Sequence, residues 1–444
     1  MKNQVAGSIG LGLLVLLLCP SVSRADAVIT WSENASKASK AACLYISGNG
    51  LFESRMYAMM HAAIHDAINA IDRRSRPYAF DAEANGPASI DAATAAAARD
   101  VLVPVLHTMP DTQPCIDAGV ASAEASYTAA LALIPAGPAK TNGVALGQAA
   151  AAAILALRAN DGSATTTWAD PNFPQGTQPG EWRFTPEPEA PQIAFAKDWG
   201  QVTPFALQRG SQFRPQRPYH LASAKYAADY NEIKDLGGNG TTTPSARTAD
   251  QTQIGLFWIE SSPLAWNRLA RAVSAERGFE LWENARLFAL LNIAMADGYI
   301  ASWEAKYHYR FWRPITAIRL GDTDGNPDTA GVPDWTPLQW TYPMPDHDSG
   351  HSVQGGVAAE ILKQVFGTDN IAFTACSTTL PAGSTCDDPG AVWRSYSSFS
   401  QAANENAVSR IYIGIHFRRA VEEGVEHGRK IAAYAVHRFV KPVR

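Results

Sequence analysis

The chain has 444 residues, of which 46% are hydrophobic and 18% are charged. This is the composition of an ordinary globular protein, and the length is sufficient for a large buried core. The formal net charge of −5 argues against a nucleic acid or an anionic membrane surface as the main partner.

The first 27 residues have the pattern of a secretory signal peptide. Lys2 supplies a positive start, residues 9–18 form an apolar segment, and Ala25-Asp26-Ala27 provides small residues for cleavage. Cys19 follows three leucines, so it lacks the small preceding residue that a lipoprotein signal needs. No later stretch has the roughly 18 apolar residues of a transmembrane helix. We expect a soluble mature protein that is periplasmic or secreted and has no integral membrane segment.

Helical periodicity dominates the first part of the mature chain. We predict helices at residues 53–71, 92–106, 116–133 and 143–159, of which the last three are rich in alanine, the residue with the highest helix propensity. From Asn160 to about Pro218 the chain is rich in Pro, Gly and Trp and has no period. A loop of this length in a compact domain indicates either a functional segment or a wrapping connector.

Helices resume after this connector. We predict them at residues 223–236, 248–258, 264–274, 279–311, 352–366, 393–417 (allowing for a break) and 421–440. Residues 321–348 form another loop region, and the sequence contains no alternating strand pattern and no repeat. The sequence therefore predicts an all-α helical bundle. Residues 28–218 would form an N-terminal helical half with a Pro-rich connector, and residues 219–444 a C-terminal half.

Four cysteines lie beyond the predicted signal. Cys376 and Cys386 flank a short Ser/Thr/Pro-rich segment, and in an oxidising compartment we expect a disulfide to close this loop. Cys43 and Cys115 are the remaining pair, and the sequence leaves their pairing open. Because no Cys-x-x-Cys pair occurs, the cysteines do not indicate a zinc site.

Three short segments of the C-terminal half could together surround an oxyanion. In the first, Lys306 and Arg313 are seven residues apart. This is almost two helical turns, so both side chains would extend from one face of a helix. Pro314 disfavours helix at Arg313, so we expect the helix to end there. Arg310 is an alternative to Arg313, and a solvated basic face is the simpler interpretation of this pair alone.

The second segment is Ser349-Gly350-His351, at the start of an amphipathic helix. A glycine amide at a helix start, with the positive end of the helix dipole behind it, is an anion-binding arrangement. His351 could act there as an acid or base near neutral pH. The alternative is an ordinary helix cap by Ser349 with a surface histidine. A serine-protease nucleophile is disfavoured because the predicted fold is helical and no Gly-x-Ser-x-Gly elbow occurs.

The third segment contains Arg410 and His416, with Gly414 between them. On a regular helix the two side chains would lie about 120° apart, so both reach one ligand only if it lies between them or if the helix bends near Gly414. By themselves they are more simply a surface arginine and a core histidine. Together, the three segments supply three fixed positive charges, a hydroxyl, a glycine amide and two histidines, which suit a phosphate-like or vanadate-like oxyanion.

These segments read Lys-x6-Arg-Pro, Ser-Gly-His and Ser-Arg-x3-Gly-x-His. In this form they resemble the three signatures of the vanadium-dependent haloperoxidases and type 2 phosphatidic acid phosphatases. Trp303 and the Phe-Trp-Arg-Pro sequence at 311–314 resemble the chloroperoxidase branch, and residues 60–67 and Pro204-Phe205 resemble its bacterial members. The resemblance covers most of the mature chain and implies an all-α bundle of the haloperoxidase/acid phosphatase type.

The resemblance implies that six residues bind the cofactor, vanadate, or phosphate in a phosphatase: Lys306, Arg313, Ser349, Gly350, Arg410 and His416. The three cations would neutralise the equatorial oxygens, to which the Ser349 hydroxyl and the Gly350 amide would hydrogen-bond. His416, one of two catalytic residues, would bond directly to vanadium, or attack phosphorus in a phosphatase. His351, the other, would act as acid and base on the apical oxygen.

The sequence departs from the family pattern at two positions. Asp348 stands where the family usually has proline, and a carboxylate there would weaken anion affinity or raise the basicity of His351. Met344 stands where members often place Phe or His, a position linked to halide preference. Methionine is polarizable but cannot donate a strong hydrogen bond. His347 would either replace a pocket histidine or lie at the rim.

Two other clusters could hold a metal ion. His61 and His65 are one helical turn apart and Asp66 follows, a pattern that can bind metal but has no evident third ligand. Residues 322–328 contain three aspartates and an asparagine in the spacing of a compact calcium loop. They lack the distal glutamate of an EF-hand, and a solvated acidic turn is the simpler interpretation.

We therefore expect a vanadate-dependent haloperoxidase that uses hydrogen peroxide to oxidise a halide to a hypohalous acid equivalent. The alternative is a secreted acid phosphatase that cleaves a phosphate ester through a phosphohistidine at His416. Trp303 and the extended N-terminal half favour the first, and the missing membrane helices argue against an integral lipid phosphatase. A non-catalytic phosphate-binding protein is a third possibility and would show binding without turnover.

Overall fold

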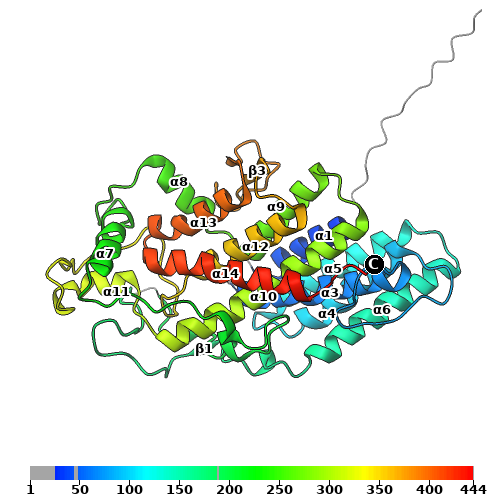
Figure 1. The fold of residues 1–444 in the computed structure, drawn as a ribbon, viewed down its shortest axis with the longest axis horizontal. Helices are drawn as coiled ribbons and strands as arrows, with labels where there is room; N and C mark the ends of the chain where they lie inside the picture. The colour runs from blue at the N-terminus through cyan, green and yellow to red at the C-terminus, as the bar shows by residue number, and fades with distance from the viewer. Residues whose placement is uncertain (1–25, 45–48, 188–189, 444) are drawn as a thin grey trace, which may run out of the picture.

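A computed structural model of the chain describes residues 26–44, 49–187 and 190–443. Helices predominate throughout this part, and its only strands form two short antiparallel ribbons, so the predicted all-α fold is confirmed (Figure 1). None of the described helices is long and apolar enough to cross a membrane. The predicted signal peptide lies outside the described residues except for Asp26 and Ala27.

The N-terminal half contributes five described helices: α1 (Ala27–Ala41), α3 (Gly50–Ile71), α4 (Ile90–Leu106), α5 (Gln113–Ala132) and α6 (Pro138–Arg158). The last four correspond to the predicted helices, whereas α1 was not predicted. Asp26 caps α1 by accepting a hydrogen bond from the Ile29 amide at 2.8 Å. Cleavage after Ala27 would remove this cap. Helices α4 and α6 touch closely, because a Cβ atom on Gly147 would lie 2.2 Å from the Ala93 carbonyl oxygen.

Residues 160–218 form the predicted connector and contain only short elements: η1 (Ser163–Thr165), β1 (Ala169–Asp170), β2 (Ala194–Phe195), η2 (Trp199–Gln201) and η3 (Gly210–Phe213). The connector is fastened to helix α10 (Leu281–Tyr309). Asp297 of α10 accepts hydrogen bonds from the backbone amides of Phe205, Ala206 and Leu207 at 2.5, 2.7 and 2.8 Å. This capture of three amides by one buried carboxylate fixes the connector against the bundle.

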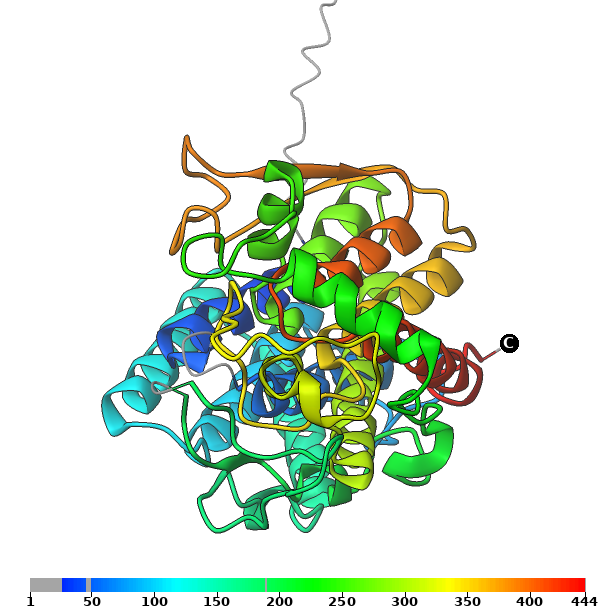
Figure 2. The same ribbon diagram turned by 90° about the vertical axis from the view of Figure 1, so that its left-hand side faces the viewer.

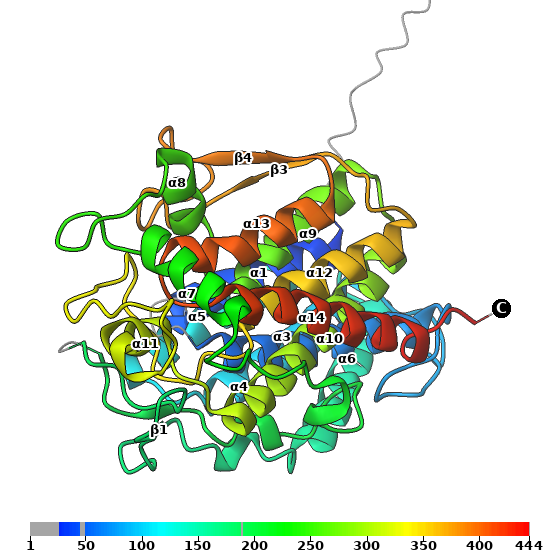
Figure 3. The same cartoon turned by 60° about the vertical axis from the view of Figure 1, so that its left-hand side comes forward.

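The C-terminal half contains α7 (Ala224–Leu236), α8 (Ala249–Phe257), α9 (Ser262–Glu276), α10, α11 (Pro314–Arg319), η4 (Gly321–Thr323), α12 (Gly350–Phe366), β3 (Phe373–Cys376), β4 (Trp393–Tyr396), α13 (Phe399–Tyr412) and α14 (Arg418–Arg438). Helices α10, α12, α13 and α14 run side by side (Figure 3). Helix α10 also packs against α3, and one buried apolar cluster contains side chains of both halves. The loop of residues 321–348, in yellow, covers the ends of the helices (Figure 2).

Two predicted helices end differently in the structure. The helix expected at 279–311 ends at Tyr309, because Arg310 adopts a left-handed conformation with φ of 47°. The helix expected at 393–417 is wrong over its outer parts: strand β4 replaces its start, and α13 ends at Tyr412. Gly414 then turns the chain with φ of 84°, and a Cβ atom there would lie 2.5 Å from the Gly237 carbonyl oxygen. Only glycine fits this turn.

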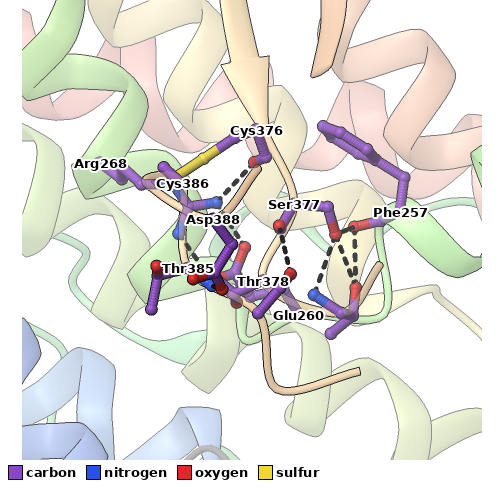
Figure 4. Close-up of a disulfide and its surroundings, with 11 residues drawn as sticks. Phe257, Glu260, Arg268, Cys376, Ser377, Thr378, Thr385, Cys386 and Asp388 are labelled. Atoms are coloured by element: carbon purple, nitrogen blue, oxygen red, sulfur yellow. Dashed lines mark hydrogen bonds and ion pairs between the residues drawn. A yellow bond between two sulfur atoms is a disulfide. The ribbon is translucent and has the colours of Figure 1, made fainter. Parts of the chain in front are cut away.

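Both disulfides are present. The expected Cys376–Cys386 bond closes the loop between β3 and β4 (Figure 4). The pairing of Cys43 with Cys115, which the sequence left open, is also formed and joins the end of α1 to α5. One disulfide thus lies among the N-terminal helices, and the other lies in the loop between β3 and β4.

Neither alternative metal cluster assembles three ligands, and no such group exists among the described residues. His65 lies 2.8 Å from Asp66 Oδ1 and 2.6 Å from Ser75 Oγ, all buried, so these three side chains fasten one another. His61 instead stacks on Phe288 at a ring distance of 5.2 Å. At 322–328, Asp324 accepts from the Thr329 hydroxyl and the Asn326 amide, which is the pattern of an ordinary turn.

Candidate active site

A cavity of about 370 Å³ lies where the C-terminal ends of α10 and α13 meet the start of α12. Six of the seven residues proposed from the sequence line it: Lys306, Arg313, Gly350, His351, Arg410 and His416. They come from three helices and two loops, and they are separated by up to 110 residues in the chain. The fold therefore brings the three segments together.

Lys306 occupies the last turn of α10 and is 1% exposed. Its ammonium group donates hydrogen bonds to the backbone oxygens of Pro345 at 3.2 Å, of Asp346 at 3.0 Å, and of Asp348. Burial and the nearby Arg313 lower the pKa of Lys306 to about 7, against the opposing charges of Asp348 and Asp346. Lys306 thus connects the loop before α12 to the end of α10. With this pKa, its charge changes near neutral pH.

Arg313 does not share a helix with Lys306, so the expected common helical face is wrong. Arg313 precedes α11 in an extended conformation, as a residue before proline should. Its Nε donates to the Met344 oxygen at 2.7 Å and its Nη1 to the Ile415 oxygen at 2.9 Å. Burial lowers the pKa of Arg313 to about 10, so it remains charged at neutral pH. Arg310, the alternative, is exposed and lies over the Phe173 ring at 5.0 Å.

His416 is held by a carboxylate that the sequence reading missed. Its Nδ1 lies 2.8 Å from Asp346 Oδ1, and its Nε2 lies 3.1 Å from Arg313 Nη1. We assign the ring proton to Nδ1, because the Asp346 carboxylate is its nearest acceptor, whereas Arg313 Nη1 lies 3.4 Å from Nδ1 and 3.1 Å from Nε2. Burial and the charge of Arg313 hold the pKa of His416 well below its usual value. His416 therefore presents an unprotonated nitrogen at the cavity, as a nucleophile or metal ligand requires.

His351 is the second residue of α12 and lines the same cavity. Its Nε2 donates to the backbone oxygen of Glu260 at 3.2 Å. Burial and the charge of Arg410 hold the pKa of His351 well below its usual value. His351 is therefore neutral in the anion-free protein, with its Nδ1 available as an acceptor. A bound anion nearby would favour its protonated form.

Arg410, on α13, has a buried donor without a partner. Its Nη1 donates to the Trp258 oxygen at 3.2 Å, but its Nε has no hydrogen-bond partner among the described residues. An unsatisfied buried donor of a charged group costs free energy, so it calls for an explanation such as a bound ion. Gly350 is the first residue of α12, and its N–H has no partner within the helix. Both groups suit an oxyanion in the cavity.

Ser349 is the one proposed residue that does not line the cavity. It is fully buried, and its hydroxyl oxygen accepts from the amide and the hydroxyl of Ser352 at 3.4 and 2.9 Å. The ordinary capping role considered for Ser349 is therefore present in the structure. Its hydroxyl proton is left to donate elsewhere.

Asp348 and His347 lie differently from what the sequence suggested. The Asp348 carboxylate accepts from Ser302 Oγ at 2.6 Å and pairs with His427 Nδ1 at 2.7 Å. It thus joins α10 to α14 instead of adjoining His351. Burial would raise the pKa of Asp348, but the hydrogen bond from His427 and the nearby charge of Lys306 contribute to a larger opposing sum, and the pKa is lowered. His347 does not line this cavity, and its Nε2 instead donates to the Gln216 backbone oxygen at 2.7 Å.

The rest of the cavity is largely apolar, and the sequence reading found only Trp303 and Met344 of it. One wall consists of aromatic side chains from the connector, α10 and the loop before α12: Phe195, Tyr299, Trp303, Trp340 and Tyr342. The disulfide-closed loop also lines the cavity, through Thr378, Thr379, Ala382 and Gly383. Long connectors without periodicity supply many of these residues, so no sequence pattern marks them.

Residues 286–444 match the VCPO second helical-bundle domain. The chain is 27% identical over 314 residues to the vanadium chloroperoxidase of Curvularia inaequalis, a match that covers 54% of this chain and 51% of that protein. The chain thus spans about half the length of this curated relative.

Solved structures show the same fold. A bacterial vanadium-dependent iodoperoxidase is 24% identical, with a TM-score of 0.75 over 94% of this chain and 97% of that one. A holo-type bacterial vanadium-dependent chloroperoxidase is 18% identical, with a TM-score of 0.69 over 94% and 97% of the two chains.

Proposed function

We propose that this chain is a vanadate-dependent haloperoxidase, because residues 286–444 match the VCPO second helical-bundle domain and the chain is similar to a vanadium chloroperoxidase. It would use hydrogen peroxide to oxidise a halide, by the overall reaction of one peroxide, one halide ion and one proton to one hypohalous acid and one water. The observation that carries the proposal is the unprotonated Nε2 of His416 in a cavity that also holds three buried cations.

The residues present fit vanadate. Lys306, Arg313 and Arg410 would hold its oxygens, and the unpaired Nε of Arg410 would gain a partner. The Gly350 amide would donate to a further oxygen, and His416 Nε2 would bind the metal. When bound, vanadate would act as a Lewis acid that activates hydrogen peroxide for two-electron oxidation of a halide.

In the proposed reaction, the protein's own residues stabilise negative charge and transfer protons. The buried Arg313 and Arg410 supply two fixed cations, and Lys306 supplies a third when it is protonated, so that negative charge is stabilised without reorganisation. His351 starts neutral, takes up a proton once negative charge lies nearby, and can then give it to the oxygen that leaves as water. Asp346 keeps the proton of His416 on Nδ1, so that Nε2 carries the lone pair, which would bind the metal in place of its contact with Arg313. Met344, 7% exposed, lies at the cavity, where it can contact a halide.

We propose in addition that the protein is exported. The signal-like residues 1–27 support this location, and so do the two disulfides, which are typical of oxidising compartments.

A paired assay tests the proposed activity. The purified protein is loaded with orthovanadate, and peroxide-dependent bromination of phenol red is measured, while the metal-free form is assayed on an aryl phosphate. We expect bromination and no phosphate release. His416→Ala should abolish bromination, whereas the exposed His437→Ala should not.

No bromination by the vanadate-loaded protein would refute the proposal. Turnover of the aryl phosphate that depends on His416 would then identify a phosphatase. Binding of phosphate without any turnover would identify a binding protein.

A further inference from the structure

We propose that Glu53 supplies protons to the cavity through the Ser261 hydroxyl. The inference rests on the proposed haloperoxidase function, because that reaction consumes one proton for each halide ion oxidised. It concerns a polar layer between α1, α3 and α9, three helices that contact one another. Seven residues make up this layer: Ser32, Ser36, Ser39, Glu53, Tyr57, Ser261 and Arg271.

Glu53 is a fully buried acid in the first turn of α3. Among the described residues, its carboxyl group has no ion-pair partner. Its oxygens instead accept hydrogen bonds from three hydroxyl groups, those of Tyr57 at 3.0 Å, of Ser39 and of Ser261. Burying a carboxylate without a cation is costly, and such a group favours its protonated form. Glu53 is therefore suited to hold a proton inside the fold.

Ser261 connects this acid to the cavity. It lines the cavity, as do Gly50 and Leu51 at the start of α3. Ser261 stands at the N-cap position of α9, where a serine hydroxyl usually bonds to the helix. Here it makes no capping bond and donates to Glu53 instead. The hydroxyl thus lies between the buried acid and the cavity.

The acid–base histidine lies close to this hydroxyl in the cavity wall. Ser261 follows Glu260 in the chain, and the Glu260 backbone oxygen accepts a hydrogen bond from His351 at 3.2 Å. Both Ser261 and His351 line the cavity. A proton that leaves Ser261 therefore reaches His351 directly or through water, once a bound anion favours the protonated form of that imidazole.

The transfer step needs no further reagent, because a hydroxyl can accept one proton while it donates another. The O–H bond of protonated Glu53 breaks as a new O–H bond forms on Ser261. The original Ser261 O–H bond breaks at the same time, and its proton passes to the acceptor in the cavity. Glu53 is left as a carboxylate until it takes up another proton.

The polar layer continues from the acid toward the surface. The Ser36 and Ser39 hydroxyls lie beside the Tyr57 phenol. Arg271 Nη1 donates to Ser36 Oγ at 3.3 Å and to Ser32 Oγ at 3.1 Å. The three serines are spaced by four and three residues, so they share one face of α1. Because Arg271 is only partly buried, the layer extends from the cavity to solvent and offers a route for the replacement proton.

Burial favours the protonated form of Glu53. It raises the pKa of Glu53 by more than the three hydroxyl partners lower it, and the like charge of Glu260 raises the pKa further. Arg268 bonds to both oxygens of Glu260 at 2.6 and 2.5 Å (Figure 4), which compensates much of that charge. The other ionisable groups around the layer are Lys40 on α1, Arg271 on α9, Tyr57 on α3 and Tyr299 on α10. Since the folded pKa is raised, the proton is held at low pH and is lost as the pH rises through that pKa.

Infrared spectra of the vanadate-free protein test the proton without using turnover. The carbonyl stretching band of a protonated carboxyl group is followed in a pH titration, and the spectrum of Glu53→Gln is subtracted to isolate Glu53. We expect the band to persist above the ordinary glutamic acid pKa of about 4.3. The matched control is Glu33→Gln, a change on the exposed face of α1, which should leave the band in place. A band that disappears at the ordinary pKa would overturn the inference.

The second measurement is kcat for bromination by the vanadate-loaded protein at saturating bromide and peroxide. We expect Glu53→Gln to lower kcat about 100-fold, at the lower end of general acid catalysis, and to remove the fall in kcat at rising pH that Glu53 causes. Vanadate affinity in dialysis should stay unchanged. Ser261→Ala should have the same effect, the double variant should lose no more than either single variant, and Ser261→Thr should recover most of the activity that Ser261→Ala loses.

Two outcomes of this measurement would overturn the inference. One is a parent-like kcat and pH dependence in Glu53→Gln, because an amide can join the helices but cannot supply the proton. The other is a pair of losses that add in the double variant, which would show that Glu53 and Ser261 act independently. If Glu53→Gln does not fold in a thermal melt, Ser261→Ala and Ser261→Thr give the same test. No bromination by the parent protein, with the Glu53 band present, would instead refute the haloperoxidase function and, with it, this use of the proton.

Discussion

Vanadate affinity should depend on pH through Lys306. In the anion-free protein burial and Arg313 lower the pKa of Lys306 to about 7. The ammonium is then about nine-tenths populated at pH 6 and about one-tenth populated at pH 8. A bound oxyanion stabilises the ammonium, so binding takes up a proton at high pH. The Lys306 contribution to affinity is therefore complete below pH 7 and is lost as the pH rises above it, by about tenfold, or ~1.4 kcal/mol, between pH 6 and pH 8.

The test is equilibrium dialysis of vanadate at pH 6 and pH 8 with Lys306→Met beside the parent protein. Vanadate itself titrates, as does Asp346, whose pKa burial raises to about 7, but these effects enter both proteins. The ratio of the two affinities isolates Lys306, and we expect it to fall about tenfold across this range. Lys306→Arg should flatten the pH dependence while retaining the charge. Lys363→Met, which removes an exposed lysine of α12, should leave affinity unchanged at both values.

A ratio that stays constant from pH 6 to pH 8 would refute the reasoning. It would mean that Lys306 keeps its charge throughout, because the three backbone oxygens around its ammonium outweigh burial. Titration calorimetry of vanadate binding, in buffers of different ionisation enthalpy, measures the proton uptake directly. If Lys306→Met leaves the proton uptake unchanged, Lys306 is not the group that takes up the proton, and the reasoning is likewise refuted.

Three further predictions concern the supports of the site and the fold. Asp346→Asn should weaken vanadate binding about 10- to 100-fold in dialysis, because it removes the charge that orients His416; unchanged affinity would show that Arg313 alone orients the ring. Asp297→Ala should lower the free energy of unfolding by roughly 1–3 kcal/mol in urea titrations, since three connector amides lose their acceptor; an unchanged midpoint would show that the connector does not depend on this carboxylate. Cys43→Ser, which opens a 72-residue separation, should cost about 4 kcal/mol, and Cys386→Ser, with a separation of 10, about 3 kcal/mol; the reverse order in thermal melts would contradict the loop-entropy account.

The sequence by itself determined most of the helices and predicted the residues that meet in the cavity. Helical periodicity is local, so most predicted helices match the structure within a few residues. Local stereochemistry also gave capping by Ser349 as an alternative and a bend near Gly414 as one of two possibilities, and the structure has both. The three motifs named the residues that now line one cavity, because their type and internal spacing do not depend on where the segments meet.

Only the tertiary structure decided how these residues are supported. The pairing of His416 with Asp346 and the contact of His351 with the Glu260 oxygen join residues 70 and 91 positions apart. Asp348 points away from His351 because Ser302 and His427, from two other helices, compete successfully for its carboxylate. No local pattern encodes such competition.

The aromatic and loop residues that line the cavity are the clearest case of a feature that only the tertiary structure reveals. The cavity's aromatic wall and its disulfide-closed wall come from loops and from one turn of α10, and loops carry no periodic signal. Trp340, in a loop, and Trp393, on β4, are both exposed tryptophans, yet only Trp340 lines the cavity. Their difference arises from which helices pack beside them, and packing depends on contacts between residues far apart in the chain.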